Sequence, residues 1–351
     1  MAEWVKREYS KGEIDRVGSL FLSREMNHDE IPRAYEVIQN WRSSHALPLL
    51  TFRMGLSKRA RRIEPDAIIA QRLKRFSSIM NKLLREPTMK LSQMQDLGGC
   101  RAILSSVYQV KRLASLYRNP VLDSESSLKC YDYIDNPKAD GYRGFHIVGR
   151  YKPHIEKNEP WNGHRIEIQL RSELQHAFAT AVETATTFTR STLKFGGGAP
   201  KWRRFFSLMG SAIAIREGTP SVPGTPFRVD DLVGELRELT KELKVRQRLR
   251  GWTDAVRTLP KRNIKNARWL LLVLDVTGKT INVTGFVNRK KASDELAKIE
   301  TNSESKVDAV LVWVNSINQL KSAYPNYYAD TAAFLDALEF SLAKGNLHRL
   351  I

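Results

Sequence analysis

Cysteine is scarce in this chain of 351 residues, where Cys100 and Cys130 are the only two. Two cysteines build neither a disulfide scaffold nor a cysteine-rich zinc site. Long apolar runs are missing as well. No stretch reaches the roughly 20 apolar residues that cross a bilayer, and the first ten residues have no apolar core of signal-peptide type. These absences predict a cytoplasmic protein without a membrane span.

Acidic residues are few relative to basic ones. The chain has 57 Lys and Arg against 38 Asp and Glu, which gives a formal net charge of +19. Such an excess favours polyanionic partners, such as nucleic acid or nucleotides, or an anionic membrane surface. A soluble protein that merely happens to be basic is the simpler alternative. The length suits two domains, with enough chain for a packed core.

The most informative stretch is YDYIDNPKADGYRGFH, residues 131–146. It combines aromatic rings with the cations Lys138 and Arg143 and the imidazole of His146. Stacking surfaces beside positive donors suit a nucleoside and its phosphates. Taken alone, a tyrosine such as Tyr142 in a glycine-containing turn is usually a packing or surface residue.

Two carboxylates flank this stretch. Asp96 opens DLGGCRAIL, and Glu167 lies in RIEIQLR, where apolar and polar residues alternate as in a strand with one buried face. Brought together by a sheet, the two carboxylates would offer the hard oxygen ligands that Mg²⁺ prefers. An aspartate just before the start of a strand is otherwise more often a cap or turn residue.

A basic segment lies upstream of Asp96. Helical spacing predicts a helix that starts at Pro65-Asp66. Its expected core face consists of Ile69, Leu73, Phe76, Met80 and Leu83. Cations on the other faces could grip triphosphate oxygens, although a charged helix face is usually only solvated. These cations are Arg72, Lys74, Arg75 and Lys82.

The run SKRARRIEP, residues 57–65, is densely basic. It reads equally well as a solvated, flexible loop and as a contact for an RNA backbone.

Downstream, the pattern predicts a mixed α+β chain. Strands are expected near 100–104, 129–134, 145–151 and 165–171, and helices near 110–117, after the capping box Ser172-x-x-Gln175, and around 202–213. REGTPSVPGTPF, residues 216–227, has the composition of a linker. Beyond it we expect a helix, a hairpin (269–276 and 280–287), a helix near 291–301, a strand (307–314) and two closing helices. This small β-β-α-β-α unit has no cysteine and only His348, so no zinc site can form in it.

Three motifs together carry a family resemblance. DLGGCRAIL, NPKADGYRGFH and EIQLRSELQHAFA resemble the synthetase domain of the RelA/SpoT-type alarmone synthetases, and RLKRFSSIMNK (72–82) is similar to that family's Arg-x-Lys…Ser…Lys segment. The resemblance covers roughly residues 30–190 in the family's order and spacing. It implies a nucleotidyltransferase-like mixed sheet flanked by helices, and ATP-dependent pyrophosphoryl transfer with release of AMP.

The resemblance also implies roles for single residues. Asp96 and Glu167 are the expected catalytic carboxylates and Mg²⁺ ligands. The expected ATP-binding residues are Arg72, Lys74, Ser78, Lys82, Arg101 and Arg171. The expected acceptor-binding residues are Lys138, Tyr142, Arg143 and His146, with Tyr142 stacked on the acceptor's base. Gln71, Leu73 and Met80 depart from the usual Gly, Pro and Tyr of the family.

The C-terminal unit resembles that of the CapRel type, a toxic small alarmone synthetase fused to its own antitoxin. Tyr324 and Tyr327 in YPNY match that group's neutralising Tyr-x-x-Tyr motif. The resemblance implies autoinhibition that a phage structural (capsid) protein releases. The corresponding domains are a pyrophosphokinase (1–218), a linker and connecting helix (219–262), and a pseudo-zinc-finger-like regulatory domain (263–351).

The acceptor hydroxyl stays open between two alternatives. CapRel-type toxins pyrophosphorylate the 3′ end of tRNA and so stop translation, whereas ordinary family members modify GTP or GDP. The net charge, the 57–65 run and the fused C-terminal unit favour tRNA over the guanosine nucleotides. A third hypothesis is a non-catalytic RNA-binding sensor on an inactive synthetase fold, against which the presence of both carboxylates argues. No membrane partner is expected.

Overall fold

The computed structural model describes residues 4–23, 30–118, 128–189, 200–255, 257–258, 267–275, 280–301, 307–314, 331–343 and 345–350. Tyr324 and Tyr327 lie outside these ranges, so their predicted role stays a prediction. Within the described ranges, no helix is both long enough and apolar enough to span a bilayer.

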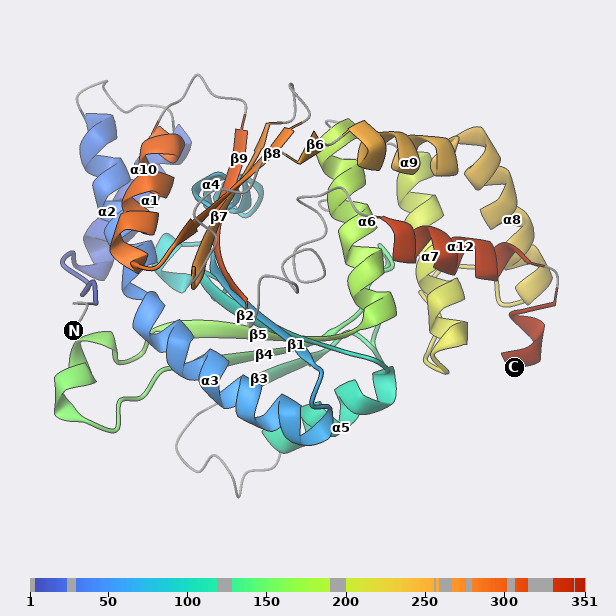
Figure 1. Ribbon diagram of the computed structural model, residues 1–351, viewed down its shortest axis with the longest axis horizontal. Helices are drawn as coiled ribbons and strands as arrows, with labels where there is room; N and C mark the ends of the chain where they lie inside the picture. Colours follow the sequence, from blue (N-terminus) through green and yellow to red (C-terminus); the bar gives the residue numbers. More distant parts are fainter. Residues whose placement is uncertain are drawn as a thin grey trace.

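One mixed sheet of nine strands runs through the molecule in the order β3-β4-β5-β2-β1-β9-β7-β8-β6 (Figure 1). The strands are β1 (Ile68–Leu73), β2 (Gly98–Leu104), β3 (Lys129–Asp132), β4 (Phe145–Arg150), β5 (Arg165–Ser172), β6 (Arg257–Thr258), β7 (Trp269–Asp275), β8 (Thr280–Phe286) and β9 (Val307–Val314). Neighbouring strands are antiparallel except β2 with β5 and β6 with β8, which are parallel. The predicted α+β class with a mixed sheet is confirmed.

Some helices pack on the sheet, and others form a helical bundle beside it (Figure 1). The α-helices are α1 (Lys11–Ser23), α2 (Ile31–Ser44), α3 (Ala46–Ile63), α4 (Phe76–Arg85), α5 (Val107–Arg118), α6 (Glu173–Thr189), α7 (Pro200–Arg216), α8 (Val229–Glu242), α9 (Val245–Ala255), α10 (Arg289–Thr301) and α12 (Ala332–Leu342). Short 3₁₀ helices are η2 (Leu91–Gln93), η4 (Glu156–Trp161) and η8 (His348–Leu350). The described residues thus contain α12 and η8 where two closing helices were expected.

The two faces of the sheet differ in polarity. Helices α3 and α5 cover one face, along which the inward positions of β2, β4 and β5 are apolar (Figure 1). This core includes Leu56, Cys100, Ala102, Ile147, Ile168 and Leu170. Because side chains alternate along a strand, the intervening residues of β5 point to the opposite face, where Glu167, Gln169 and Arg171 lie.

The predicted capping box at the start of α6 is confirmed. The Gln175 N–H donates to Ser172 Oγ at 3.1 Å, and the Ser172 N–H donates to Gln175 Oε1 at 3.2 Å. Two N–H groups at the beginning of the helix are thereby satisfied. The cap fixes where strand β5 ends and helix α6 begins.

The helix predicted from Pro65-Asp66 is wrong in its first half. Residues 68–73 form strand β1, which pairs antiparallel with β2 on one side and with β9 on the other. The spacing of Ile69 and Leu73 fits a helix, but it equally fits alternate positions of a strand. Only from Phe76 onward does the chain become helical, in α4.

The basic run at 57–65 is also not a loop. Its residues up to Ile63 are the last turns of α3, where Leu56 and Ala60 are fully buried against the sheet. Lys58, Arg61 and Arg62 are exposed on this helix.

Residues 216–227, expected to be a linker, pack against α7. Val222 is buried, and its N–H donates to Ser211 Oγ at 2.8 Å. Helix α7 is buried along most of its length, and it shares a single apolar core with α6, α8, α9 and α12 (Figure 1). In the described residues, the units expected from the sequence therefore share one helical core and one sheet.

The C-terminal β-unit has the expected order of elements. Strands β7 and β8 form the predicted hairpin, α10 packs on β7 and β9, and β9 lies antiparallel to β7. The other edge of β9 pairs with β1, with Val312 opposite Arg72. This strand pair joins the C-terminal unit to the part of the chain that carries the predicted ATP site.

Candidate active site

The polar face of the sheet brings the predicted site residues together. Gln169 of β5 lies between Arg101 of β2 and His146 of β4 in the strand register. Two residues earlier along β5, Glu167 lies beside Gly99 of β2, and Gly99 lies beside Arg72 of β1. Residues paired directly across strands share a face, so all of these side chains except glycine project to one side.

Because Gly99 has no side chain, it leaves a hollow, meaning an open space, on this face of the sheet. A Cβ atom added to Gly99 would meet nothing within 4 Å, whereas one added to Gly98 would lie 2.7 Å from Ile166 Cδ1 in the core. The two adjacent glycines thus face opposite sides of the sheet. The open space lies between the Arg72 and Glu167 positions.

Asp96 is held by two lysines just before β2 begins. Lys74 Nζ lies 2.7 Å from Asp96 Oδ2, and Lys82 Nζ lies 3.1 Å from Asp96 Oδ1. Burial alone would raise the pKa of Asp96, but the two ammonium groups hold it well below its usual value. For Lys74 burial has the opposite effect: it lowers the pKa of the ammonium group, and the nearby Asp96 charge opposes this change. The cluster is a half-buried carboxylate between two cations.

Glu167 belongs to a closed ring of hydrogen bonds. His146 Nδ1 lies 3.0 Å from Glu167 Oε1, and Gln169 Nε2 donates to Glu167 Oε2 at 2.7 Å. Tyr142 OH lies 2.6 Å from His146 Nε2. Arg171 Nη2 closes the ring by donating to Tyr142 OH and to Gln169 Oε1, both at 3.0 Å.

The ring fixes protonation states as well as positions. Burial would raise the pKa of Glu167, but His146 and the Gln169 amide hold it below its ordinary value against the repulsion of Asp96. Burial raises the pKa of Tyr142, and the cations Arg171 and Arg101 oppose this rise. Tyr142 therefore stays protonated while Glu167 stays ionised.

Aromatic rings and a cation extend the site beyond the ring. The Tyr133 and His146 rings meet edge to face with centroids 5.2 Å apart. Lys138 Nζ lies 4.3 Å from the centroid of Tyr133 and 5.5 Å from that of Tyr142. Aromatic faces beside an exposed ammonium suit a nucleobase and a phosphate.

The structure corrects the expectation for Arg143. Its side chain is 2% exposed and donates to the carbonyl oxygens of Ile134 (3.0 Å), Gly210 (3.2 Å) and Pro220, and to Thr219 Oγ1 (3.1 Å). Burial lowers the pKa of Arg143 to about 10. This guanidinium faces the interior, between the 131–146 stretch and residues 216–227, because the loop backbone there offers it acceptors. It holds the loop in place instead of facing an acceptor.

The other predicted residues divide between two sides of the site. On the Asp96 side, Arg72 lies on β1, Ser78 and Lys82 lie on α4, and Lys74 lies in the connection between these elements. Arg171, expected to bind ATP, lies in the Glu167 ring beside Tyr142. Within the described residues, no group of three or more His, Cys, Asp and Glu side chains could hold a metal ion.

Gln169 and Tyr133 complete the site but were not singled out from the sequence. Gln169 could have been found, because it occupies the position between Glu167 and Arg171 on the same face of an alternating strand. Tyr133 carries no comparable signal, since its contact with His146 depends on how β3 and β4 pair.

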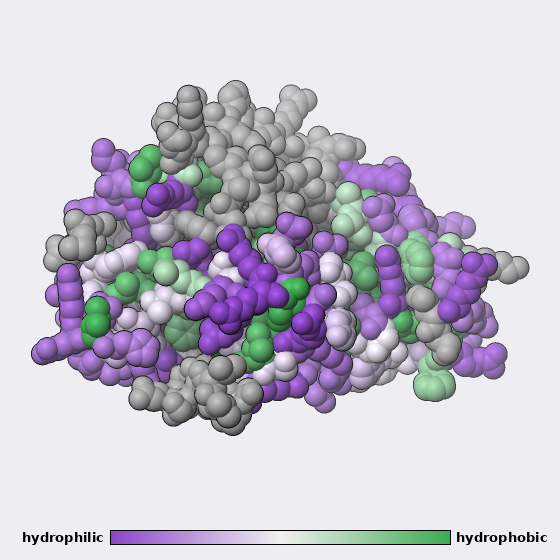
Figure 2. Space-filling view, turned by 60° about the horizontal axis from the view of Figure 1, so that its bottom comes forward, coloured by the Kyte–Doolittle hydropathy of each residue, from purple (hydrophilic) through white to green (hydrophobic). Residues whose placement is uncertain are grey.

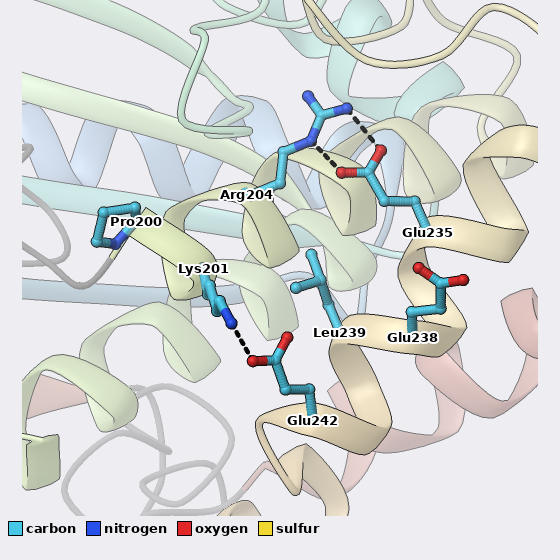
Figure 3. Close-up of a pocket in the computed structure, with 7 residues that line it drawn as sticks. All are labelled: Pro200, Lys201, Arg204, Glu235, Glu238, Leu239 and Glu242. Atoms are coloured by element: carbon cyan, nitrogen blue, oxygen red, sulfur yellow. Dashed lines mark hydrogen bonds and ion pairs between the residues drawn. The ribbon is translucent and has the colours of Figure 1, made fainter.

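A surface pocket between α7 and α8 lies apart from this site (Figure 3). Two ion pairs span it, Arg204 with Glu235 and Lys201 with Glu242, and Leu239 forms part of its wall. None of the predicted site residues lines this pocket.

Comparisons with known proteins find similarity over part of this chain. Residues 71–191, about a third of the chain, match the family described as "Region found in RelA / SpoT proteins". The GTP pyrophosphokinase YwaC of Bacillus subtilis (strain 168) is 30% identical over 106 residues, which are 29% of this chain and 49% of that protein. The chain thus spans about half the length of this curated relative. Residues 71–191 are therefore similar to the region found in RelA / SpoT proteins.

Two solved structures are also similar to part of this chain. Small alarmone synthetase 1 from Bacillus subtilis bound to its product pppGpp is 20% identical, covers 50% of this chain and 90% of its own, and has a TM-score of 0.41. A GTP pyrophosphokinase family protein from Streptococcus pneumoniae is 20% identical and has a TM-score of 0.37. The match covers 57% of this chain and 93% of that protein's chain.

Proposed function

We propose that the RelA/SpoT-type region transfers a pyrophosphoryl group from ATP to the 3′ end of tRNA, releases AMP, and so inhibits translation. The observation that carries this proposal is one polar sheet face with two differently held carboxylates. Asp96 is surrounded by lysines that fit a polyphosphate, and Glu167 is surrounded by groups that fit an acceptor hydroxyl.

The donor side is suited to a triphosphate. Lys74 and Lys82 are within reach of Asp96, and Arg72 lies across the hollow at Gly99 from Glu167. Ammonium and guanidinium groups bind phosphate oxygens through charge-assisted hydrogen bonds. In this proposal Ser78 and Arg101 add further donors at the ends of the phosphate chain.

Mg²⁺ fits the same place. It usually takes one or two protein carboxylates together with substrate phosphates. Asp96 lies just before β2 and Glu167 lies on the neighbouring parallel strand β5, close enough for the charge of Asp96 to act on Glu167. Asp96 and Glu167 would hold the ion once Lys74 and Lys82 turn to the phosphates. When bound, the ion neutralises charge that develops on the transferred group.

The chemistry is a displacement at the β-phosphorus. The acceptor oxygen forms a bond to this atom while the bond to the oxygen that bridges the α- and β-phosphates breaks, and that oxygen leaves on AMP. The proton of the acceptor hydroxyl passes to Glu167, which His146 and Gln169 hold ionised and oriented. Lys138, Tyr142 and His146 position the acceptor.

The surface charge supports tRNA as the acceptor. Lys58, Arg61 and Arg62 are exposed along the last turns of α3. Figure 2, in which the side of the molecule that carries α3 and α5 is turned forward, shows hydrophilic side chains gathered across the middle of this face. A basic surface binds an RNA backbone without regard to sequence, and Tyr133 and Tyr142 offer stacking surfaces for an unpaired 3′ end.

GTP or GDP is the second candidate acceptor. The curated relative is named a GTP pyrophosphokinase, and a guanine base would stack on Tyr142 as well as an adenine does. The same two carboxylates would then make an alarmone instead of a modified tRNA.

Regulation by the C-terminal part belongs to the same proposal. In it, Tyr324 and Tyr327 hold the enzyme inactive until a phage structural protein binds the C-terminal unit. Support comes from the position of β9, which is hydrogen-bonded to β1 beside Arg72. A change in the C-terminal unit could therefore reach the ATP site through two adjacent strands.

The test is transfer of label from [γ-³²P]ATP by the full chain, with deacylated tRNA and GTP plus GDP competing in one tube. The full chain is used because β9 belongs to the sheet, and a Tyr324→Ala, Tyr327→Ala variant is run beside it to relieve inhibition. Label on tRNA that is lost with Glu167→Gln, but not with the exposed control Glu156→Gln, is the expected result.

Two other outcomes would contradict the proposal. Label on guanosine nucleotide alone would make the protein an alarmone synthetase. Absence of Mg²⁺-dependent AMP release in both the full chain and the Tyr324→Ala, Tyr327→Ala variant would favour a non-catalytic RNA-binding sensor.

A further inference from the structure

Glu300, in the last turn of α10, makes a buried contact with the N-terminal half of the chain. Its Oε2 lies 2.6 Å from Arg42 Nη1 and accepts from Gln39 Nε2 at 2.8 Å, both on α2. Its Oε1 accepts from the backbone N–H of Phe76 at 3.4 Å. The side chains of Arg42 and Glu300 are only 3% and 9% exposed.

The Phe76 contact lies at the start of α4. The first N–H groups of a helix lack partners within the helix, and the N-cap residue Arg75 gives no side-chain cap. A carboxylate at this end is favourable because the helix dipole is positive there. Glu300 therefore serves as the cap that the local sequence of α4 does not provide.

Other groups around Glu300 reinforce this arrangement. Tyr35 OH donates to Glu300 Oε2 at 3.4 Å, and burial raises the pKa of Tyr35 to about 12, so the hydroxyl stays a donor. The Tyr35 and Phe76 rings pack with centroids 4.9 Å apart. At the other end of α10, Arg289 lies against the rings of Trp4 and Trp269, which fixes the helix to the N-terminal segment.

Helix α4 carries Lys82, which pairs with Asp96 at the opposite end from Phe76. Six residues separate Phe76 from Lys82, a rise of about 9 Å along a helix. A shift or fraying of α4 at Phe76 would therefore move the Lys82 ammonium relative to Asp96. Of the neighbouring cations, Arg72 belongs to β1 and Lys74 follows this strand directly. Strand β1 pairs along one edge with β9 of the same C-terminal unit.

We propose that Glu300 is a positioning residue for the donor site. By binding Arg42, Gln39 and the Phe76 N–H, it sets the position of α4 and so the distance between Lys82 and Asp96. This rests on the ATP-dependent function proposed above and extends it, because it makes the C-terminal unit a structural part of the ATP site in addition to any inhibitory role.

Glu300→Ala is the first variant for the test. It removes both the cap of α4 and the partner of Arg42, whose buried charge is then unpaired. We expect the KM for ATP to rise about tenfold, the equivalent of about 1.4 kcal/mol, with kcat changed by less than about threefold. Glu295→Gln, on an exposed face of the same helix in a surface pair with Lys298, is the matched control and should leave the KM unchanged.

A double variant separates positioning from general destabilisation. In Arg42→Met, Glu300→Gln the buried charges are both gone, while the amide oxygen still accepts from the Phe76 N–H. We expect this variant to recover most of the ATP affinity lost in Glu300→Ala. If the two variants raise the KM equally, the cap on α4 is not what Glu300 contributes, and the proposal fails.

Amide hydrogen exchange without nucleotide gives a readout that does not depend on activity. We expect Glu300→Ala to speed exchange across the first turns of α4 by about tenfold, and the double variant to restore it. Unchanged exchange in α4 would overturn the positioning role even if the enzyme is active. A wild-type chain that releases no AMP, together with the expected exchange pattern, would instead count against the proposed function alone.

Discussion

At the scale of single residues, neighbours in sequence have opposite roles. Tyr142 and Arg143 are adjacent, yet the Tyr142 hydroxyl joins the ring around Glu167, whereas the Arg143 side chain is buried among backbone carbonyls. Both residue types were expected to touch the acceptor. Both residues lie in the loop before β4, so the path of the loop backbone decides which of the two side chains joins the ring.

Tyr142→Phe removes one hydroxyl from this ring and keeps the aromatic face. His146 Nε2 and Arg171 Nη2 each lose a partner, so we expect kcat to fall about tenfold while the KM for the acceptor stays within about twofold. Steady-state kinetics with Tyr142→Ala as comparison checks this, because Ala should also raise the acceptor KM. An acceptor KM that rises in Tyr142→Phe would mean that the hydroxyl contacts the acceptor directly.

Arg143→Met tests the structural role of the buried guanidinium. Three carbonyl oxygens and Thr219 Oγ1 lose their donor, and we expect the free energy of unfolding to fall by about 3 kcal/mol. Urea denaturation measures this, with the exposed Arg112→Met as control. Stability equal to wild type, together with a raised acceptor KM, would indicate that Arg143 contacts the acceptor after all.

At the scale of elements, the Gly98-Gly99 pair at the start of β2 shows how one strand serves two faces. The position of Gly98 is filled by the core, and that of Gly99 opens onto the hollow between Arg72 and Glu167. Glycine is needed at the first position for packing and at the second for the space it leaves on the polar face.

Substitution of each glycine should therefore have a different effect. Gly98→Ala overpacks the core against Ile166, and we expect a loss of about 1–3 kcal/mol in the free energy of unfolding. Gly99→Leu should change stability by less than about 1 kcal/mol but fill the hollow and raise the KM for ATP at least about tenfold. Denaturation and ATP kinetics on both variants test this, and an unaffected ATP KM in Gly99→Leu would show that ATP does not use the hollow.

At the scale of the whole molecule, two histidines link distant parts of the chain beneath the sheet. His45, between α2 and α3, and His164, just before β5, are buried with ring centroids 4.6 Å apart. Ser44 Oγ lies 2.9 Å from His164 Nε2. Burial lowers the pKa of His45 to about 3 and that of His164 to about 4, so both rings are neutral in the folded protein.

This pair predicts a loss of stability in mild acid. The unfolded chain takes up protons at these histidines below about pH 6.5, and the folded chain does not until about pH 4, so stability is full above pH 6.5 and falls as the pH drops between those values. From pH 7 to pH 5 we expect a loss of about 2 kcal/mol for each histidine. Urea denaturation at both pH values checks the loss.

His164→Gln supplies the comparison for the same experiment. The variant should show a smaller fall in stability between pH 7 and pH 5 than wild type, whatever its stability at pH 7. His154→Gln, an exposed histidine, should behave as wild type. Equal slopes in all three proteins would mean that the buried pair does not control the acid response.

The local sequence determined the parts of this protein that depend on near neighbours. Alternation along residues 165–171 set both faces of β5, Ser172 and Gln175 set the start of α6, and the two apolar runs around Gly278 predicted the β7–β8 hairpin. The same alternation placed Glu167 on the polar face of β5, whereas its catalytic role and that of Asp96 stay predictions. These features follow from periods of two residues and from contacts a few residues apart.

Only the tertiary structure decided the rest, because it depends on distant partners. Residues 68–73 became β1 through pairing with β2 and β9, although their spacing also fits a helix. Arg143 turned inward because residues 210 and 220 bring it carbonyl oxygens, and Glu300 caps a helix more than 200 residues away. No local pattern indicates a partner that far along the chain, so spacing alone could not predict which cations lie beside Asp96.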